Sequence, residues 1–257
     1  MPAKSHAWPR GHWDWYQHLA FKHGIRAGEL IFVGGQVDKD ERGDPLRPHD
    51  LAAQTGVVVR HIDTVLREFG AGLADVTKLV AFYADDGSVD PDAFLTDVGR
   101  HVLEIGGAPD GVGPAITPVP LPWLALPGMM VEIEAVARLG RDGRRPPRRA
   151  ATPPGLPPLP PPFSHGLRSG EHVWVSGQSG RAADDLAAQT DVAMERIARV
   201  LAELGADLDD AVKVNAWFAG DGTRATWEPA ARGRARWFRA PRPVITDLPT
   251  PRLGRGE

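Results

Sequence analysis

The stretch that decides the fold is Gly24-Ile-Arg-Ala-Gly-Glu-Leu-Ile-Phe-Val-Gly-Gly-Gln36, because it recurs as Gly166-Leu-Arg-Ser-Gly-Glu-His-Val-Trp-Val-Ser-Gly-Gln178. In each copy a Gly-x-Arg-x-Gly-Glu turn leads into a short run of β-branched and aromatic residues that ends at Gly-Gln. This pattern is typical of a strand that runs into a loop. The two-residue spacing of Ile31 and Val33 predicts that both side chains face the same side of a sheet.

The repeat extends well beyond this stretch. Leu51-Ala-Ala-Gln-Thr55 recurs as Leu186-Ala-Ala-Gln-Thr190, and Leu66-Arg-Glu-Phe-Gly70 recurs as Leu201-Ala-Glu-Leu-Gly205. The offset between the copies falls from 142 to 135 residues, so the second copy has a shorter loop before its first helix. Repeats of this length indicate duplicated domains, since solenoid repeats span only about 20 to 50 residues.

The composition excludes several classes of protein. The 257 residues, 42% hydrophobic and 25% charged, can form two cores of roughly 100 to 130 residues each. A formal net charge of −3 makes nucleic acid and anionic membranes unexpected partners. The absence of cysteine excludes disulfides and zinc–thiolate sites. Because we find neither an apolar run of about 20 residues nor a signal core, we expect a cytoplasmic protein.

Large aromatic side chains crowd the amino-terminal region, namely Trp8, Trp13, Trp15, Tyr16 and Phe21. We expect them to pack on the first domain or on a neighbouring subunit, since aromatic residues mostly serve as buried area. Stacking on a ligand is the alternative. The histidines of this region match no single helical face and have no carboxylate cluster beside them, so we expect no metal site.

Hydrophobic periodicity predicts the secondary structure of each copy. Apolar residues step by three and four along residues 51–69 and again after Pro91, which indicates two amphipathic helices. Residues 75–83 and 130–137 are rich in β-formers and predict strands, and the second of these alternates strictly. The second copy repeats the pattern through residues 227–238, but it reaches Glu257 before any equivalent of the last strand.

A proline- and arginine-rich segment separates the copies. It contains Arg144-Arg-Pro-Pro-Arg-Arg149, followed by several proline pairs up to Pro162. Proline at this density favours an extended spacer. An SH3-type ligand, or arginines on an acidic surface, are the alternatives. The predicted organisation is therefore a first domain over residues 1–139 with an aromatic extension, a linker over 140–162, and a second domain over 163–257 without its last strand.

The order of elements predicts the α+β class, with a mixed sheet and two helices on one of its faces in each domain. The other face of such a sheet has to be covered by something. We therefore expect a homo-oligomer.

Both copies resemble the RidA (YjgF) family of reactive-intermediate deaminases. The resemblance rests on the strand ending in Gly-Gln, the helix ending at Glu-x-Gly-Ala, the strand with its lysine, and the closing Leu-Pro-Gly-x-x-Val-Glu-Ile-Glu-Ala-Val-Ala of the first copy. It spans roughly residues 21–139 and 163–252. It implies a chorismate-mutase-like fold, usually trimeric, with cofactor-free sites between subunits. It also implies hydrolysis of small imino or enamino acids, such as 2-aminoacrylate, to ketoacids and ammonia.

The resemblance implies site residues that are divided between the copies. The family's arginine clamp, in a Pro-x-Arg segment, is matched by Arg242, with Arg239 as the competitor. The small hydroxyl before Gly-Gln is matched by Ser176, and Gly177 follows it with a backbone donor. The family's carboxylate is matched by Glu132, and Phe163 stands where the family has a tyrosine.

A composite site would combine Ser176 and Arg242 of the second copy with Glu132 of the first. Each of these residues also has a structural explanation, because arginines near a surface are mostly solvated and a serine at a strand end can bond locally. Arg26 and Arg168 recur in the turns, and we expect structural use there. The alternative function is a catalytically degenerate protein that binds a small carboxylate or serves as an oligomeric scaffold. A ribonuclease is disfavoured, because no basic stripe with interleaved aromatic residues occurs outside the linker.

Overall fold

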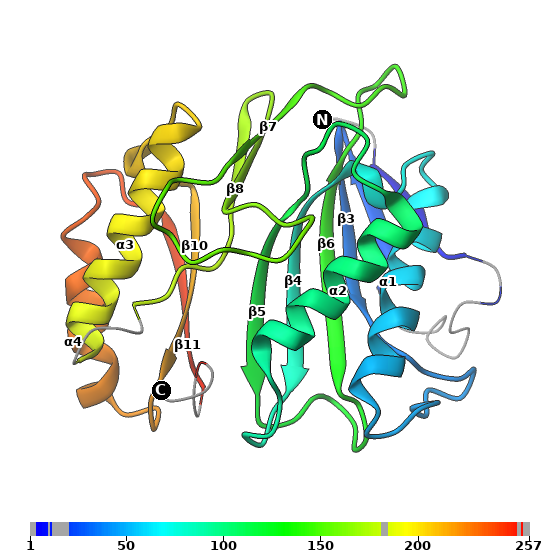
Figure 1. Cartoon of the computed structure of the whole chain (residues 1–257), viewed down its shortest axis with the longest axis horizontal. Helices are drawn as coiled ribbons and strands as arrows, with labels where there is room; N and C mark the ends of the chain where they lie inside the picture. The colour runs from blue at the N-terminus through cyan, green and yellow to red at the C-terminus, as the bar shows by residue number, and fades with distance from the viewer. Residues whose placement is uncertain (1–3, 10, 12–20, 181–184, 251–252, 254–257) are drawn as a thin grey trace.

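The computed structural model describes residues 4–9, 11, 21–180, 185–250 and 253. Two α+β halves lie side by side, which confirms the predicted class (Figure 1). The first half contains β1 (Lys4–Ala7), β2 (Gly24–Ala27), β3 (Leu30–Gln36), α1 (Leu51–Arg67), η2 (Leu73–Asp75), β4 (Val76–Ala84), α2 (Pro91–Gly106), β5 (Ala115–Leu121) and β6 (Val131–Arg138). The second half contains β7 (Arg148–Ala151), β8 (Gly166–Ser169), β9 (His172–Val175), α3 (Leu186–Glu203), η3 (Leu208–Asp210), β10 (Lys213–Ala219), α4 (Arg224–Ala235) and β11 (Val244–Thr250).

The first domain is built on a six-stranded mixed sheet in the order β1-β2-β3-β6-β4-β5. Strands β4 and β5 are parallel, and the other neighbours are antiparallel. The repeated turn is therefore the centre of a hairpin, β2–β3, rather than the start of one strand. Strand β5 lies at the edge of the sheet, where Pro118 and Pro120 are tolerated because an edge strand leaves some N–H groups unused.

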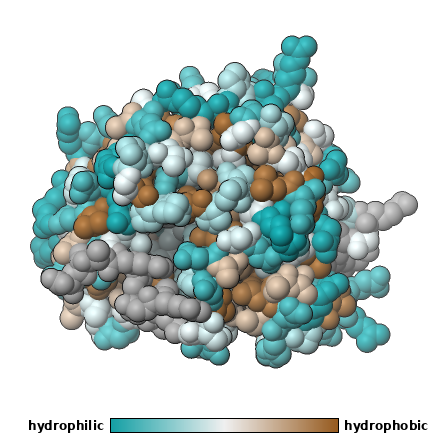
Figure 2. Space-filling model, in the orientation of Figure 1, coloured by the Kyte–Doolittle hydropathy of each residue, from teal (hydrophilic) through white to brown (hydrophobic). Residues whose placement is uncertain are grey.

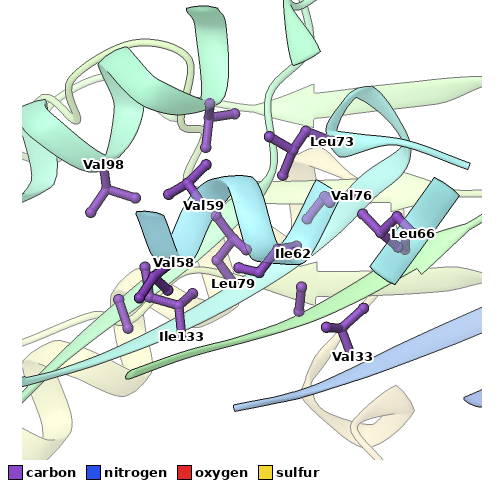
Figure 3. Close-up of a cluster of buried hydrophobic side chains, with 14 of the residues drawn as sticks. Val33, Val58, Val59, Ile62, Leu66, Leu73, Val76, Leu79, Val98 and Ile133 are labelled. Carbon is purple, nitrogen blue, oxygen red and sulfur yellow. The ribbon is translucent and has the colours of Figure 1, made fainter. Parts of the chain in front are cut away.

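Helices α1 and α2 cover one face of this sheet and enclose the main core. Ile31 and Val33 both point into it, as their spacing predicts, and Ile62 and Leu66 of α1 meet them there (Figure 3). Complete burial of a side chain of this size stabilises the fold by about 1.5–3 kcal/mol. On the outer surface, teal polar residues dominate the view of Figure 2, with smaller brown patches between them.

Matched caps fix the first helix of each copy. The side chain of Asp50 accepts a hydrogen bond from Ala53 N (2.9 Å) and that of Asp185 accepts one from Ala188 N (2.8 Å), which satisfies a first-turn donor in each helix. Beyond the carboxyl ends, Gly70 has φ +72° and the equivalent Gly205 has φ +70°. Both glycines adopt the left-handed conformation that commonly ends a helix.

The second domain repeats these elements with fewer strands. Its strands form an antiparallel sheet β7-β8-β9 and a separate parallel pair β10-β11. Among the described residues no strand corresponds to β6. The predicted bounds of one helix were wrong: α4 runs over Arg224–Ala235 rather than over residues 227–238, and Pro229 lies inside it.

One prediction for the chain connections needs correction. The segment over residues 140–162 is not a spacer throughout, because Arg148–Ala151 forms β7 and pairs with β8. Its arginines also contact acidic and backbone groups: Arg148 bonds Asp110 (2.5 Å) and is almost completely buried at its side chain. At the amino terminus, the ring of Trp8 lies 5.8 Å from that of Phe21, so these rings pack on each other. Trp13, Trp15 and Tyr16 lie outside the described residues.

The repeated arginines of the turns serve the same structural purpose in both copies. Arg26 donates hydrogen bonds to the carbonyl oxygens of Phe69 and Leu139, and Arg168 donates to that of Leu204. Each guanidinium therefore binds backbone oxygens just beyond the end of the first helix of its domain, where carbonyl groups lack helical partners. The expected structural role is correct, although backbone carbonyls rather than carboxylates are the partners.

None of the described helices is both long and apolar enough to span a bilayer.

Candidate functional site

The two domains meet where β5 of the first approaches the end of β9 in the second. Ser176 lies at this seam, 3% exposed, and its hydroxyl accepts a hydrogen bond from Ile116 N (2.8 Å) and donates one to Ser164 O (2.6 Å). Gly177 N donates to Ile116 O (3.1 Å). A Cβ at Gly177 would lie 3.0 Å from Thr117 Cγ2. Close approach of two backbones therefore requires the small residues at this strand end.

A lysine completes the contact on the sheet face that α1 and α2 leave uncovered. Lys78 of β4 donates hydrogen bonds to Thr117 Oγ1 (2.5 Å) and to the carbonyl oxygen of Val175 (2.8 Å). Enclosure of the amine in the seam lowers the pKa of Lys78 to about 7, and the negative charge of Glu134 offsets this only in part. An amine with a pKa near neutrality loses its charge readily.

The end of the linker packs against α2 and the segment before β5. Phe163 is 7% exposed and belongs to the core of the first domain. A Cβ at Gly99 of α2 would lie 2.3 Å from Pro161 O, and one at Gly113 would lie 1.8 Å from Pro162 O. Helix, strand and linker are therefore packed backbone to backbone. The cleft between the domains is closed at this end.

An open pocket lies at the other end of β4 and β5. It has a volume of about 490 Å³ and is lined by Phe82, Leu121, Trp123, Leu124, Ala125 and Glu132. Glu132 enters from β6 and lies next to Phe82 of β4 in the sheet register. The pocket is thus a shallow and largely apolar depression with one carboxylate in its wall.

The position of Glu132 follows from the Gly-Gly of the repeated stretch. A Cβ at Gly35 would lie 1.8 Å from Glu132 Oε1, so only glycine leaves room for the carboxylate above β3. Burial raises the pKa of Glu132; the positive charge of Lys39 opposes this shift, and the negative charge of Glu134 adds to it. A carboxyl group with a raised pKa is suited to acid–base catalysis.

Comparison with known proteins identifies the family. The model of the family described as endoribonuclease L-PSP matches residues 16–139 and 157–250, which are the two copies of the repeat. The chain belongs to this family, the RidA/YjgF family, as a tandem duplication.

Its relatives are similar to single copies of the repeat. The RutC family protein YjgH of Escherichia coli is 29% identical over 139 residues, which cover 54% of this chain and 98% of YjgH. The solved structure of YjgH has a TM-score of 0.44 at 28% identity and covers 54% of the chain. That of Rv2704 from Mycobacterium tuberculosis, a member of the YjgF/YER057c/UK114 family, has a TM-score of 0.41 at 26% identity, covering 53% of this chain and all of Rv2704.

In this RidA-family tandem, the predicted site residues do not converge. Ser176, Gly177 and Phe163 lie in the closed part of the seam, and the hydroxyl of Ser176 is already used both as donor and as acceptor. Ser176 contacts Ile116 of β5, and β4 lies between β5 and β6. In the sheet register Ile116 is level with Ala135 of β6, which is three residues along that strand from Glu132. Standard strand spacings make this separation roughly 14 Å. The composite site is therefore not formed within one chain.

Arg242 is exposed in the loop before β11 and lines neither of the two best-formed pockets among the described residues. The sheet register gives a different correspondence between the two copies, and the role of Arg242 stays a prediction. Lys78 pairs with Ala115 and Lys213 with Val244, so Pro114-Ala-Ile116 corresponds to Pro243-Val-Ile245. The position of the family's Pro-x-Arg arginine therefore falls on Ile116 and on Ile245. Neither copy has an arginine there.

Sequence reasoning missed Lys78, whose burial arises only when the domains meet. A signal was available, because the β4 lysine recurs in β10 as Lys213 and the β5 threonine recurs in β11 as Thr246. The second pair also forms a hydrogen bond, but it is exposed.

Proposed function

We propose that this RidA-family chain hydrolyses small imino or enamino acids to ketoacids and ammonia, and that Glu132 is the acid–base group. The proposal depends on one observation: of the five predicted site residues, Glu132 alone lines an open pocket, and its pKa is raised by burial. Family membership supports the reaction class but does not by itself establish the activity.

The chemistry requires few groups. A protonated Glu132 would donate its proton to the enamine carbon or the imine nitrogen, which makes the imine carbon electrophilic. The resulting carboxylate would then accept a proton from the water molecule that adds to this carbon. Collapse of the carbinolamine breaks the C–N bond, so that one imine and one water give one ketone and one ammonia. Positioned proton transfer of this kind contributes about 10²- to 10⁴-fold to a rate.

The lining of the pocket also limits the polarity and charge of the substrates that fit it. Phe82, Trp123 and Leu124 provide apolar walls, and the lining contains no cation. The pKa of Glu132 is nevertheless influenced by the positive charge of Lys39, so one cation lies within electrostatic reach. We therefore propose a small imino acid with an apolar side chain that faces these walls, and with its carboxylate toward Lys39.

An ammonia-release assay with imino acids generated in situ tests this function. Glu132→Gln is expected to reduce the rate at least about 100-fold, in line with the loss of a general acid. Glu171→Gln is the control, since it changes an exposed carboxylate in the turn of the second domain that does not line the pocket. Equal rates for wild type and Glu132→Gln would overturn the proposal.

A second candidate function is a small-carboxylate-binding or scaffold protein without turnover. The observation that favours it is the closed seam, in which isoleucine occupies the clamp position and linker backbone fills the cleft. It predicts no ammonia release from wild type with any imino acid of the tested series.

We also propose a homo-oligomer, assembled as a trimer of tandem chains. Several large apolar side chains remain exposed in the single chain, among them Phe32 (46%), Val244 (66%) and Leu248 (48%). Covering such residues is a common reason for association. Mass measurement in solution by light scattering decides between a trimer and other states.

A further inference from the structure

Trp123 is the most exposed aromatic side chain of the described residues. It is 75% exposed and belongs to the wall of the pocket that contains Glu132. Single exposed apolar side chains are common on protein surfaces, but Trp123 has apolar neighbours. Leu126 in the same loop is 36% exposed, and Leu121 lines the pocket with it. Apolar surface gathered at a pocket indicates a contact with something outside the chain.

The loop that carries Trp123 is fixed by the segments around it. Leu124 and Met129 are buried, 9% and 4% exposed, and belong to one apolar cluster. Between them, Gly128 O accepts a hydrogen bond of 2.8 Å from the buried side-chain amide of Gln54. The backbone that carries the indole is therefore held in place before a ligand arrives, so that less conformational entropy is lost on binding.

A second aromatic ring lies in the same pocket. Phe82 of β4 lines it, and the ring of Phe82 meets that of Trp217 edge-on, with centroids 6.4 Å apart and an interplanar angle of 69°. Edge-to-face contact is a favoured arrangement of aromatic rings, and here it supports the orientation of Phe82. Glu132 pairs with Phe82 in the sheet register. Two rings and the proposed acid–base group therefore share one pocket.

The shallow form of the pocket decides how a substrate can be selected. A shallow depression encloses little of a ligand, so it selects side chains by volume less strictly than a closed cavity does. Contact with an exposed indole does not require enclosure. Aromatic rings in contact gain free energy beyond the area that they bury, and an aliphatic side chain of similar size lacks this gain.

We propose that Trp123 determines substrate specificity by contacting the ring of a 2-imino acid whose side chain is aromatic. This role of Trp123 rests on the proposed function, because Glu132 has to perform the hydrolysis in the same pocket. The enamine tautomer of such a substrate is conjugated with its ring and therefore flat, a shape that suits contact with an exposed indole. Reactions that oxidise aromatic amino acids to imino acids are the class that would supply it.

Binding tests the contact without turnover. The probes are 3-phenyllactate and 3-cyclohexyllactate, stable carboxylates that differ in the aromaticity of the ring, titrated calorimetrically into the whole chain. We expect the phenyl compound to bind about 2- to 10-fold more tightly, the range that an aromatic pair provides, and Trp123→Leu to remove this difference. Trp227→Leu is the matched control, since it removes a tryptophan that is 39% exposed and does not line the pocket. Equal affinities of wild type for the two compounds, or no saturable binding of 3-phenyllactate, overturn the proposal.

Turnover separates this role from the proposed function. The imines of phenylalanine and cyclohexylalanine are generated in situ, and the ratio of their kcat/KM values should fall about 2- to 10-fold in Trp123→Leu, mainly through KM. If ammonia is released but this ratio is unchanged, Trp123 has no such role and the proposed hydrolysis stands. If no ammonia is released but the preference for 3-phenyllactate depends on Trp123, the hydrolysis fails and the aromatic contact stands.

Light scattering tests whether a second copy covers the indole instead. We expect Trp123→Leu to have the same mass in solution as wild type. A changed mass would place Trp123 in a contact between copies of the chain and overturn the proposal.

Discussion

Lys78 of the first domain donates a hydrogen bond of 2.8 Å to the main-chain carbonyl oxygen of Val175 in the second. This hydrogen bond directly links the two copies of the repeat. Because the amine is enclosed, its pKa falls to about 7 from a usual value of 10.5. The unfolded chain therefore binds a proton more readily than the folded chain between these two pH values.

The first prediction concerns the pH dependence of stability. With the folded pKa of Lys78 near 7 and the unfolded value at 10.5, the contribution of this group to the free energy of unfolding rises as the pH increases from 7 to 10.5. Lys78→Met should remove this rise. The measurement is urea denaturation at several pH values, read as the difference between wild type and variant. Parallel curves for the two proteins would contradict the assignment.

The second prediction concerns Ser176. Ser176→Ala removes the acceptor of Ile116 N and the donor to Ser164 O in a buried seam, and an unsatisfied buried group costs about 1–3 kcal/mol. We expect the free energy of unfolding to fall by this amount, while any ammonia release per folded molecule stays unchanged. Thr96→Ala, which removes an exposed helical hydroxyl, is the control and should change stability little. If Ser176→Ala loses turnover while its free energy of unfolding is unchanged, Ser176 has a catalytic rather than a structural role.

The third prediction concerns Glu132. Since its pKa is raised in the folded state, the carboxyl group favours folding at low pH, and this contribution is lost as the pH rises from 4.5 through the folded pKa. Glu132→Gln should therefore gain stability relative to wild type as the pH rises from 4.5 through the folded pKa of Glu132. The rate of imine hydrolysis by wild type should fall as the pH rises through the same pKa, because the protonated form is the acid. Thermal unfolding and initial rates on one buffer series measure both effects.

Much of the fold could be predicted from local sequence. The periodicity of α1 and the alternation of β6 depend on neighbouring residues, and both elements lie within two residues of their expected bounds. Strands β5 and β11 were missed because Pro118, Pro120 and Pro249 argue against strands. These prolines are tolerated because β5 and β11 lie at sheet edges, which is a property of the topology.

The site was less predictable, for a related reason. Ser176 was assigned by its place before Gly-Gln, but its bonding partner Ile116 lies 60 residues away in the chain. Only docking of the domains shows that the hydroxyl is used structurally. The resemblance suggested Arg242 from the sequence Pro-Arg-Pro, whereas the β10–β11 register places Ile245 at the clamp position. Glu132 lies on the polar face of the regular strand β6, as the alternation predicts, and its role in catalysis stays a prediction.

The final prediction tests whether linker backbone closes the seam, using two helical glycines. Replacing glycine by alanine inside a helix normally stabilises it by up to about 1 kcal/mol. At Gly99 of α2 the added Cβ would lie 2.3 Å from Pro161 O, so Gly99→Ala must displace the linker and should instead lower the unfolding temperature.

At Gly233 of α4 the nearest atom lies 3.7 Å away, so Gly233→Ala should raise the unfolding temperature. Limited proteolysis near Pro161 should accelerate in the Gly99 variant alone. If both variants are stabilised, the linker does not press on α2.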